Sequence, residues 1–128
     1  MKDFCIIGSG ISGSTIANAL SKRYSLDVYD KARGAGGRSS NKKFNKNESF
    51  DHGVQYISPK SSQFKRFINN LIIKKIVKKW PGKHKFLNKD KKEDKKHLKI
   101  IGNKGNNSIS KYLLKNINCI FNTELIKI

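Results

Sequence analysis

Cysteine, arginine, acidic residues and long hydrophobic runs are all scarce in this 128-residue sequence. The two cysteines, Cys5 and Cys119, are too few for a disulfide framework. Each lies in an apolar run, so we expect both thiols to be buried and inert in a reducing compartment. The apolar run near the start is too short for a secretion signal or a membrane span, so we predict a cytoplasmic protein without a membrane partner.

Acidic residues number only 9 against 28 basic ones, which gives a formal net charge of +19. Such a charge favours nucleic acids or anionic surfaces as partners. The lysines are spread along most of the chain, however, and the aromatic residues do not alternate with them as in a base-stacking surface. We therefore predict no specific nucleic-acid partner, and a basic nucleic-acid-binding module remains an alternative that rests on charge alone.

The order of the predicted elements indicates a single α/β domain. A short buried strand at 4–7, a helix at 11–23 and a second strand at 26–29 form a right-handed βαβ unit. The rest of the chain is expected to form a loop with a weak hairpin (32–49), a helix (63–77), a solvated charged loop (83–99), a helix (108–116), and strands at 119–121 and from 124 onward. We expect the strand at the C-terminal end to lie beside the second strand in a parallel sheet.

The turn between the first strand and the first helix reads Gly8-Ser9-Gly10-Ile11-Ser12-Gly13, a G-x-G-x-x-G motif. Its first glycine permits a tight turn, the second lets the backbone approach a pyrophosphate, and the third lets the helix pack close to the sheet. The helix N-terminus then presents free N–H groups to the phosphates. Asp30 ends the second strand, where a carboxylate can bind an adenosine ribose. This motif predicts a dinucleotide site, without separating NAD from FAD.

Two of the four arginines lie in the glycine-rich stretch KARGAGGRSS at 31–40. A guanidinium can form two parallel hydrogen bonds with a phosphate, which an ammonium cannot. Glycine lets the main chain come close to a ligand. This stretch therefore also predicts binding of a pyrophosphate.

Together with Asp30, this stretch resembles a second signature of the flavin amine-oxidase superfamily, YDKARGAGGR. The segment FDHGVQYIS at 50–58 is similar to the corresponding segment of renalase and its bacterial relatives. IIGNKGNNSISKYLL and NTELIKI resemble a later helix and strand of that family. The resemblance covers nearly the whole chain at matching spacing.

The resemblance implies a Rossmann-like fold with parallel sheet and helices, FAD as the cofactor, and hydride transfer to the flavin from an amine or a dihydronicotinamide. Arg38 after Gly37 would reach the diphosphate, with Arg33 a weaker candidate, and Gly53, Val54 and Gln55 would pass near the flavin ring. The full set of residues expected to bind the cofactor is Gly8, Ser9, Gly10, Ile11, Ser12, Gly13, Asp30, Lys31, Arg33, Gly37, Arg38, Gly53, Val54 and Gln55. No catalytic residue is assigned.

Against this family, we expect a truncated FAD-binding domain composed of a βαβ unit (1–30), a flavin loop (31–58), an inserted mainly helical segment (59–99) and a helix–strand return (100–128). Lys104 and Asn106 replace residues common in these relatives, and we expect both differences to be minor. The alternative to an oxidoreductase is a non-catalytic remnant, or a subunit that a second chain completes. The histidines match no metal-ligand spacing, so we predict no metal site. Tyr56 and Trp80 are candidates to flank a substrate or to anchor the core.

Overall fold

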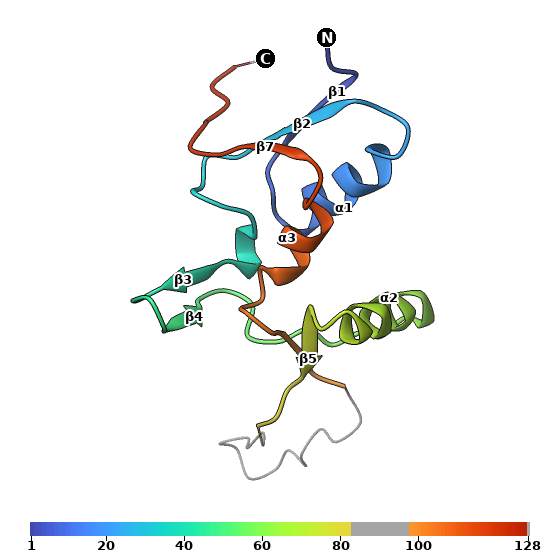
Figure 1. Ribbon diagram of the computed structural model, residues 1–128, viewed down its shortest axis with the longest axis vertical. Coiled ribbons are helices and arrows are strands. Elements are labelled where there is room, and N and C mark those ends of the chain that lie inside the picture. Colours follow the sequence, from blue (N-terminus) through green and yellow to red (C-terminus); the bar gives the residue numbers. More distant parts are fainter. Residues whose placement is uncertain (83–97, 128) are drawn as a thin grey trace.

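A computed structural model describes residues 1–82 and 98–127 and contains the predicted βαβ unit. Strand β1 (Phe4–Ile7), helix α1 (Ile11–Leu20) and strand β2 (Leu26–Tyr29) follow one another directly. Strand β7 (Asn118–Ile120) pairs with β2, so that a parallel sheet has the order β1-β2-β7 (Figure 1). The α/β fold and the predicted parallel pairing of the last strand with the second are both confirmed.

Helix α1 packs beside helix α3 (Ser108–Leu113), and a small core joins them to the sheet. Ala17 of α1 is fully buried against Leu26 and Val28 of β2 and Leu114 after α3. The Asn18 side-chain amide donates a 2.9 Å hydrogen bond to the Leu113 carbonyl and so ties the two helices together. A small residue at position 17 lets the helix approach the sheet closely.

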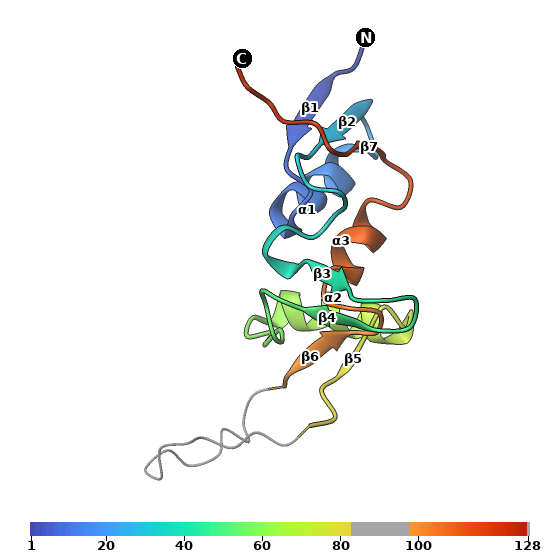
Figure 2. The same cartoon turned by 90° about the vertical axis from the view of Figure 1, so that its left-hand side faces the viewer.

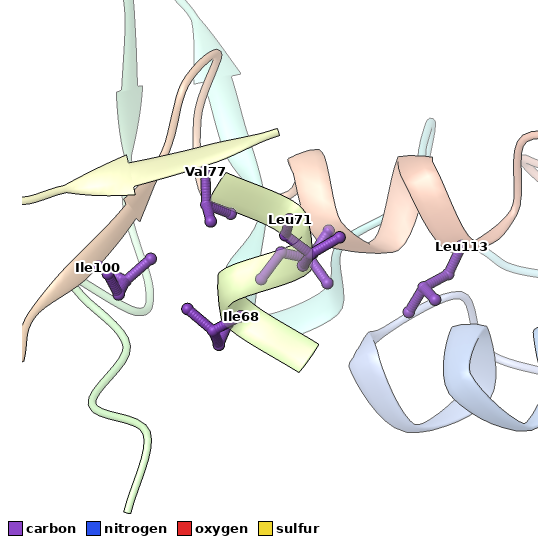
Figure 3. Packing of buried hydrophobic residues seen from close by; sticks show 6 residues of the cluster. Ile68, Leu71, Val77, Ile100 and Leu113 are labelled. Carbon is purple, nitrogen blue, oxygen red and sulfur yellow. The ribbon is translucent and has the colours of Figure 1, made fainter. Parts of the chain in front are cut away.

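A second core joins helix α2 (Ser62–Ile73) to the antiparallel pair of strands β5 (Val77–Lys79) and β6 (Ile100–Gly102). Figure 3 shows how its side chains converge from these elements. The buried members are Ile68, Leu71, Val77, Ile100, Ile109 and Leu113. Because the last two belong to α3, which also borders the first core, this helix connects the two parts of the molecule (Figure 2).

The glycine-rich segment after β2 contains a short 3-10 helix η1 (Gly37–Ser39) and then an antiparallel pair, β3 (Asn41–Lys43) with β4 (Ser49–Asp51). A weak hairpin was expected within 32–49, and the observed pair extends beyond this range to Asp51. Its turn is held by the Asn45 side chain, which accepts hydrogen bonds from the N–H groups of Asn47 and Glu48.

The predicted helix at 63–77 is too long at its C-terminal end. The helix ends at Ile73, because Lys75 adopts a left-handed backbone (φ 57°) and Ile76 donates back to the Leu71 carbonyl at 2.9 Å. Val77 then begins β5, which the sequence analysis missed together with its partner β6. Ile76 and Val77 continue the apolar pattern of the helix, so periodicity alone does not reveal this end.

Other predicted boundaries also need correction. Helix α1 ends at Leu20 rather than at 23, and α3 ends at Leu113 rather than at 116. The predicted fourth strand is wrong over its described part, since residues 124–127 form no strand. The predicted charged loop lies, for residues 83–97, outside the described part of the chain. None of the helices in the described residues is long and apolar enough to cross a membrane.

Candidate functional site

The first glycine turn, residues 8–13, joins β1 to α1 in a backbone geometry that needs glycine. Gly8 has a φ of +97°, and its N–H donates to the Tyr29 carbonyl at 2.7 Å. A Cβ atom at Gly13 would lie only 1.9 Å from the Gly8 carbonyl oxygen. The helix therefore begins directly against the turn.

A second glycine turn packs against the first one, backbone to backbone. Gly36 has a φ of +142°, and its N–H donates to the Ser9 carbonyl at 3.1 Å. A Cβ atom at Gly37 would lie 3.1 Å from the Cα of Gly10. Part of the free space beside Gly10, which the sequence analysis assigned to a ligand, is thus taken by the chain's own second turn.

Asp30 connects the end of β2 to the first glycine turn. One oxygen of its carboxylate accepts hydrogen bonds from the N–H and the hydroxyl of Ser9, and the other accepts from the N–H of Ala32 at 2.8 Å. Partial burial by itself would raise the pKa of this carboxyl. The hydrogen bonds from Ser9 and Ala32, together with the charge of Lys31, outweigh burial and lower the pKa of Asp30 below its usual value.

A cleft of about 540 Å³ opens at the N-terminus of α1. No side chain caps this helix end, and its first turn contains no acidic residue. Its positive dipole end therefore faces the cleft without a compensating charge from its own first turn. The lining residues are Ile7, Gly8, Gly10, Ile11, Ser12, Gly13, Arg38, Ser39 and Val54.

Arg38 is the cationic residue of this cleft. Its side chain is exposed, and it forms no hydrogen bond or ion pair with another described residue. Its backbone carbonyl accepts a 2.9 Å hydrogen bond from the N–H of Val54, which brings the 53–55 segment to the cleft. A Cβ atom at Gly53 would lie 2.0 Å from the Arg38 carbonyl oxygen, so this contact depends on glycine.

Half of the fourteen residues expected to bind a cofactor line this cleft. The lining includes Gly8, Gly10, Ile11, Ser12, Gly13, Arg38 and Val54, and adds Ile7 and Ser39, which the sequence analysis missed. Ser9 is fully buried behind the turn, where it holds Asp30. The residues that do not line the cleft are Ser9, Asp30, Lys31, Arg33, Gly37, Gly53 and Gln55. A signal for Ser39 is its position directly after the G-G-R turn.

Lys31 and Arg33 are exposed outside the cleft. The Lys31 ammonium lies 3.5 Å from the Glu124 carboxylate in an exposed ion pair. Tyr56 and Trp80, the two candidates to flank a substrate, do contact each other, with an edge-to-face arrangement and 5.6 Å between ring centroids. Neither of them lines the cleft.

Asn106 does not line the cleft, but its hydrogen bonds hold the segment that contains Val54, which does. Its buried side chain accepts from the Gly102 N–H and donates to the carbonyls of Val54 and Gln55. The Asn106 N–H donates to the Asp51 carboxylate at 2.8 Å. These hydrogen bonds fix the 51–55 segment that carries Val54, a role that the sequence analysis did not predict.

The paired glycine turns, the parallel sheet and the acid that ends β2 define the class of this protein as a Rossmann-like dinucleotide-binding domain. The sequence model of the NAD(P)-binding Rossmann-like domain family matches residues 6–71, and the chain belongs to this family. A similar solved structure is that of a putrescine oxidase double mutant from a redesign of cofactor binding. It has 28% sequence identity and a TM-score of 0.47 over 62% of this chain. The chain spans about a sixth of that protein, with 17% of it covered.

Proposed function

We propose that this chain is the dinucleotide-binding part of an FAD-dependent oxidoreductase resembling renalase and the flavin amine oxidases. The observation that carries the proposal is that two anion-binding features share one cleft. They are the N-terminus of α1, which no side chain caps, and Arg38, whose side chain has no ion-pair or hydrogen-bond partner among the described residues. The resemblance of the 30–58 segment to flavin enzymes favours FAD over NAD.

The residues present fit the diphosphate of such a cofactor. Among the described residues that line the cleft, none carries a carboxylate that would repel the phosphates. The N–H groups in the first turn of α1 and the guanidinium of Arg38 would hold the two phosphates. Asp30 would accept hydrogen bonds from the ribose, because each carboxylate oxygen can accept more than the bonds it already has.

When bound, FAD supplies the site that accepts a hydride from an amine or from a dihydronicotinamide. The chain's own residues bind and orient the cofactor. Asn106 and Asp51 hold the backbone of Val54 and Gln55 in place, and this backbone would border the flavin end. We further propose, from the sequence, that the substrate is an amine or a dihydronicotinamide and that the protein is cytoplasmic.

The test is a titration of the purified chain with FAD in high salt, which suppresses non-specific attraction of anions to its large positive charge. We expect a retained flavin absorption band and a measurable Kd. Arg38→Gln should weaken FAD binding about tenfold or more, since a hydrogen bond to a charged group contributes about 1.5–3 kcal/mol. Arg66→Gln is the matched control, because Arg66 is an exposed residue of α2 that does not line the cleft.

A folded wild-type chain that binds no FAD would contradict the proposal, as would equal Kd values for the wild type and Arg38→Gln. A parallel titration with NAD separates the two dinucleotides. If FAD binds, peroxide release with amines and with dihydronicotinamides then tests the oxidoreductase activity.

A second candidate function is a dinucleotide-binding subunit that another chain completes. The observation that favours it is strand β1, which lies at the edge of the sheet with Cys5 and Ile7 exposed on the face opposite α1. FAD binding without peroxide release from either class of substrate would support this second function. Turnover by the chain alone would exclude it.

A further inference from the structure

A second and larger cleft, of about 640 Å³, lies among the helices α1, α2 and α3. Its lining residues are Ile11, Thr15, Asn18, Ala19, Lys22, Ser39, Val54, Ile57, Ser61, Gln63, Phe64, Phe67, Ile109 and Leu113. Ile11, Ser39 and Val54 also line the first cleft, so the two clefts adjoin each other. We call this second cleft the helical cleft.

The lining of the helical cleft is mostly apolar, with a few polar groups at defined places. Phe64 and Phe67 of α2 stack with 6.2 Å between ring centroids and form one wall. Amides and hydroxyls are contributed by Asn18 and Gln63 and by three Ser or Thr residues. A mainly apolar cleft of a few hundred cubic ångströms with a few polar groups is typical of a small-molecule site.

The charge that the described residues bring to the lining of the helical cleft is positive. Among the described residues that line it, Lys22 is the charged one, and none is an aspartate or a glutamate. The Lys22 ammonium forms no ion pair or hydrogen bond with another described residue. A cationic ligand entering this cleft would lose its hydration without gaining a counter-charge, whereas an anionic group would gain one at Lys22.

We propose that the helical cleft binds an apolar carboxylate, with its apolar body along Phe64 and Phe67 and its carboxylate toward Lys22. A cationic amine is excluded by the same chemistry. The proposal does not depend on which dinucleotide the first cleft binds, because Lys22, Phe64 and Phe67 lie outside the glycine turns.

The experiment uses two probes that differ in the charge of one end, decanoate and decylamine, each below its micelle-forming concentration and without FAD. Binding is followed by the methyl NMR signals of Ile109 and Leu113, which line the helical cleft and not the first cleft. We expect these signals to shift with decanoate, and its Kd to be at least tenfold lower than that of decylamine. Lys22→Gln should raise the Kd of decanoate about threefold to tenfold.

Lys43→Gln is the matched control, because Lys43 is an exposed residue of β3 outside the helical cleft. It removes the same charge from the chain and should leave the Kd of decanoate unchanged. Ala19→Glu is a second variant that places a carboxylate in the cleft at an exposed helical position, and it should reverse the preference toward decylamine.

Three results would overturn the proposal. The first is an equal Kd for the two probes, and the second is an equal effect of Lys22→Gln and Lys43→Gln, which would mean general attraction to a basic chain. The third is binding of decanoate without any shift of the Ile109 and Leu113 methyl signals. Since FAD is absent from every sample, failure of FAD binding changes none of these outcomes.

Discussion

At the scale of single residues, Gly13 makes the tightest requirement of the first glycine turn. Gly13→Ala would place a Cβ atom 1.9 Å from the Gly8 carbonyl oxygen, so the helix or the turn must move. We expect a loss of about 1–3 kcal/mol in the free energy of unfolding, measured by urea denaturation. Weaker FAD binding should accompany it.

Gly34→Ala is the control for this substitution. A Cβ atom at Gly34 would meet no other atom within 4 Å, and its φ lies outside the left-handed region. Its effect on stability should stay within about 0.5 kcal/mol. Equal losses for the two variants would show that the 1.9 Å contact is not what makes residue 13 a glycine.

Asp30 should make stability depend on pH in the acidic range. Its pKa is lower in the folded chain than in the unfolded chain, where it is about 3.9. Asp30 therefore adds stability above the unfolded pKa, and this contribution is lost as the pH falls through the lower folded value. Asp30→Asn should be less stable than the wild type by about 1–3 kcal/mol near neutral pH, with the gap shrinking below about pH 4.

Unfolding curves of both proteins between about pH 7 and about pH 2 measure this gap. Asp3 and Asp27 also have lowered pKa values, but they titrate in both proteins and so cancel in the difference. A gap that stays constant over the whole range would contradict the assignment to Asp30.

At the scale of elements, Asn106 joins the turn after β6 to the segment after β4. Asn106→Ala would leave the N–H of Gly102 and the carbonyls of Val54 and Gln55 without their side-chain partner. We expect a loss of about 2–4 kcal/mol in the free energy of unfolding by urea denaturation.

Asn69→Ala serves as the control, because Asn69 is an exposed residue inside α2. Alanine is the better helix former, so stability should change by less than about 0.7 kcal/mol, in the favourable direction. If Asn106→Ala were as stable as this control, the 51–55 segment would be held by other contacts.

The elements also show where prediction from local sequence stops. The βαβ unit was predictable because an apolar run, a glycine motif and a helical pattern follow each other without interruption. The end of α2 was not predictable, since Ile76 and Val77 fit a helix as well as a strand. After the helix ends, Val77–Lys79 pairs with Ile100–Gly102, a partner far along the chain. Local periodicity contains no information about such a partner.

At the scale of the whole molecule, one face of the parallel sheet is covered by α1 and α3, and the opposite face of β1 is exposed. Side chains alternate along a strand, so Ile6 faces α1 while Cys5 and Ile7 face the other side. The prediction of a buried Cys5 is therefore wrong. It assumed that an apolar run in a parallel strand is covered on both faces.

Cys5 should consequently react with Ellman's reagent much faster than Cys119, which is half-buried and whose pKa is raised by burial. We expect two kinetic phases near neutral pH, and Cys5→Ser should remove the fast one. A fast phase that survives in Cys5→Ser would contradict the exposed β1 face. Slower reaction of Cys5 on addition of a completing chain would locate that chain on this face.

In the candidate site, too, the sequence predicted some features and only the tertiary structure revealed the others. The positions of Gly8, Gly13 and Arg38 followed from the motifs, because glycine at a tight turn and arginine near a phosphate are local requirements. The sequence did not show that Gly36 and Gly37 would pack on Ser9 and Gly10. Nor did it show that Ser39 would enter the cleft.

The sequence by itself determined the βαβ order, the glycine turns and the residue types available for binding a dinucleotide. These depend on backbone conformation and on interactions between near neighbours. The tertiary structure decided which of these residues share a cleft, that Asp30 holds Ser9, and that Asn106 supports Val54. Such contacts join residues far apart in the chain, and they form only when packing of the two cores brings the segments together.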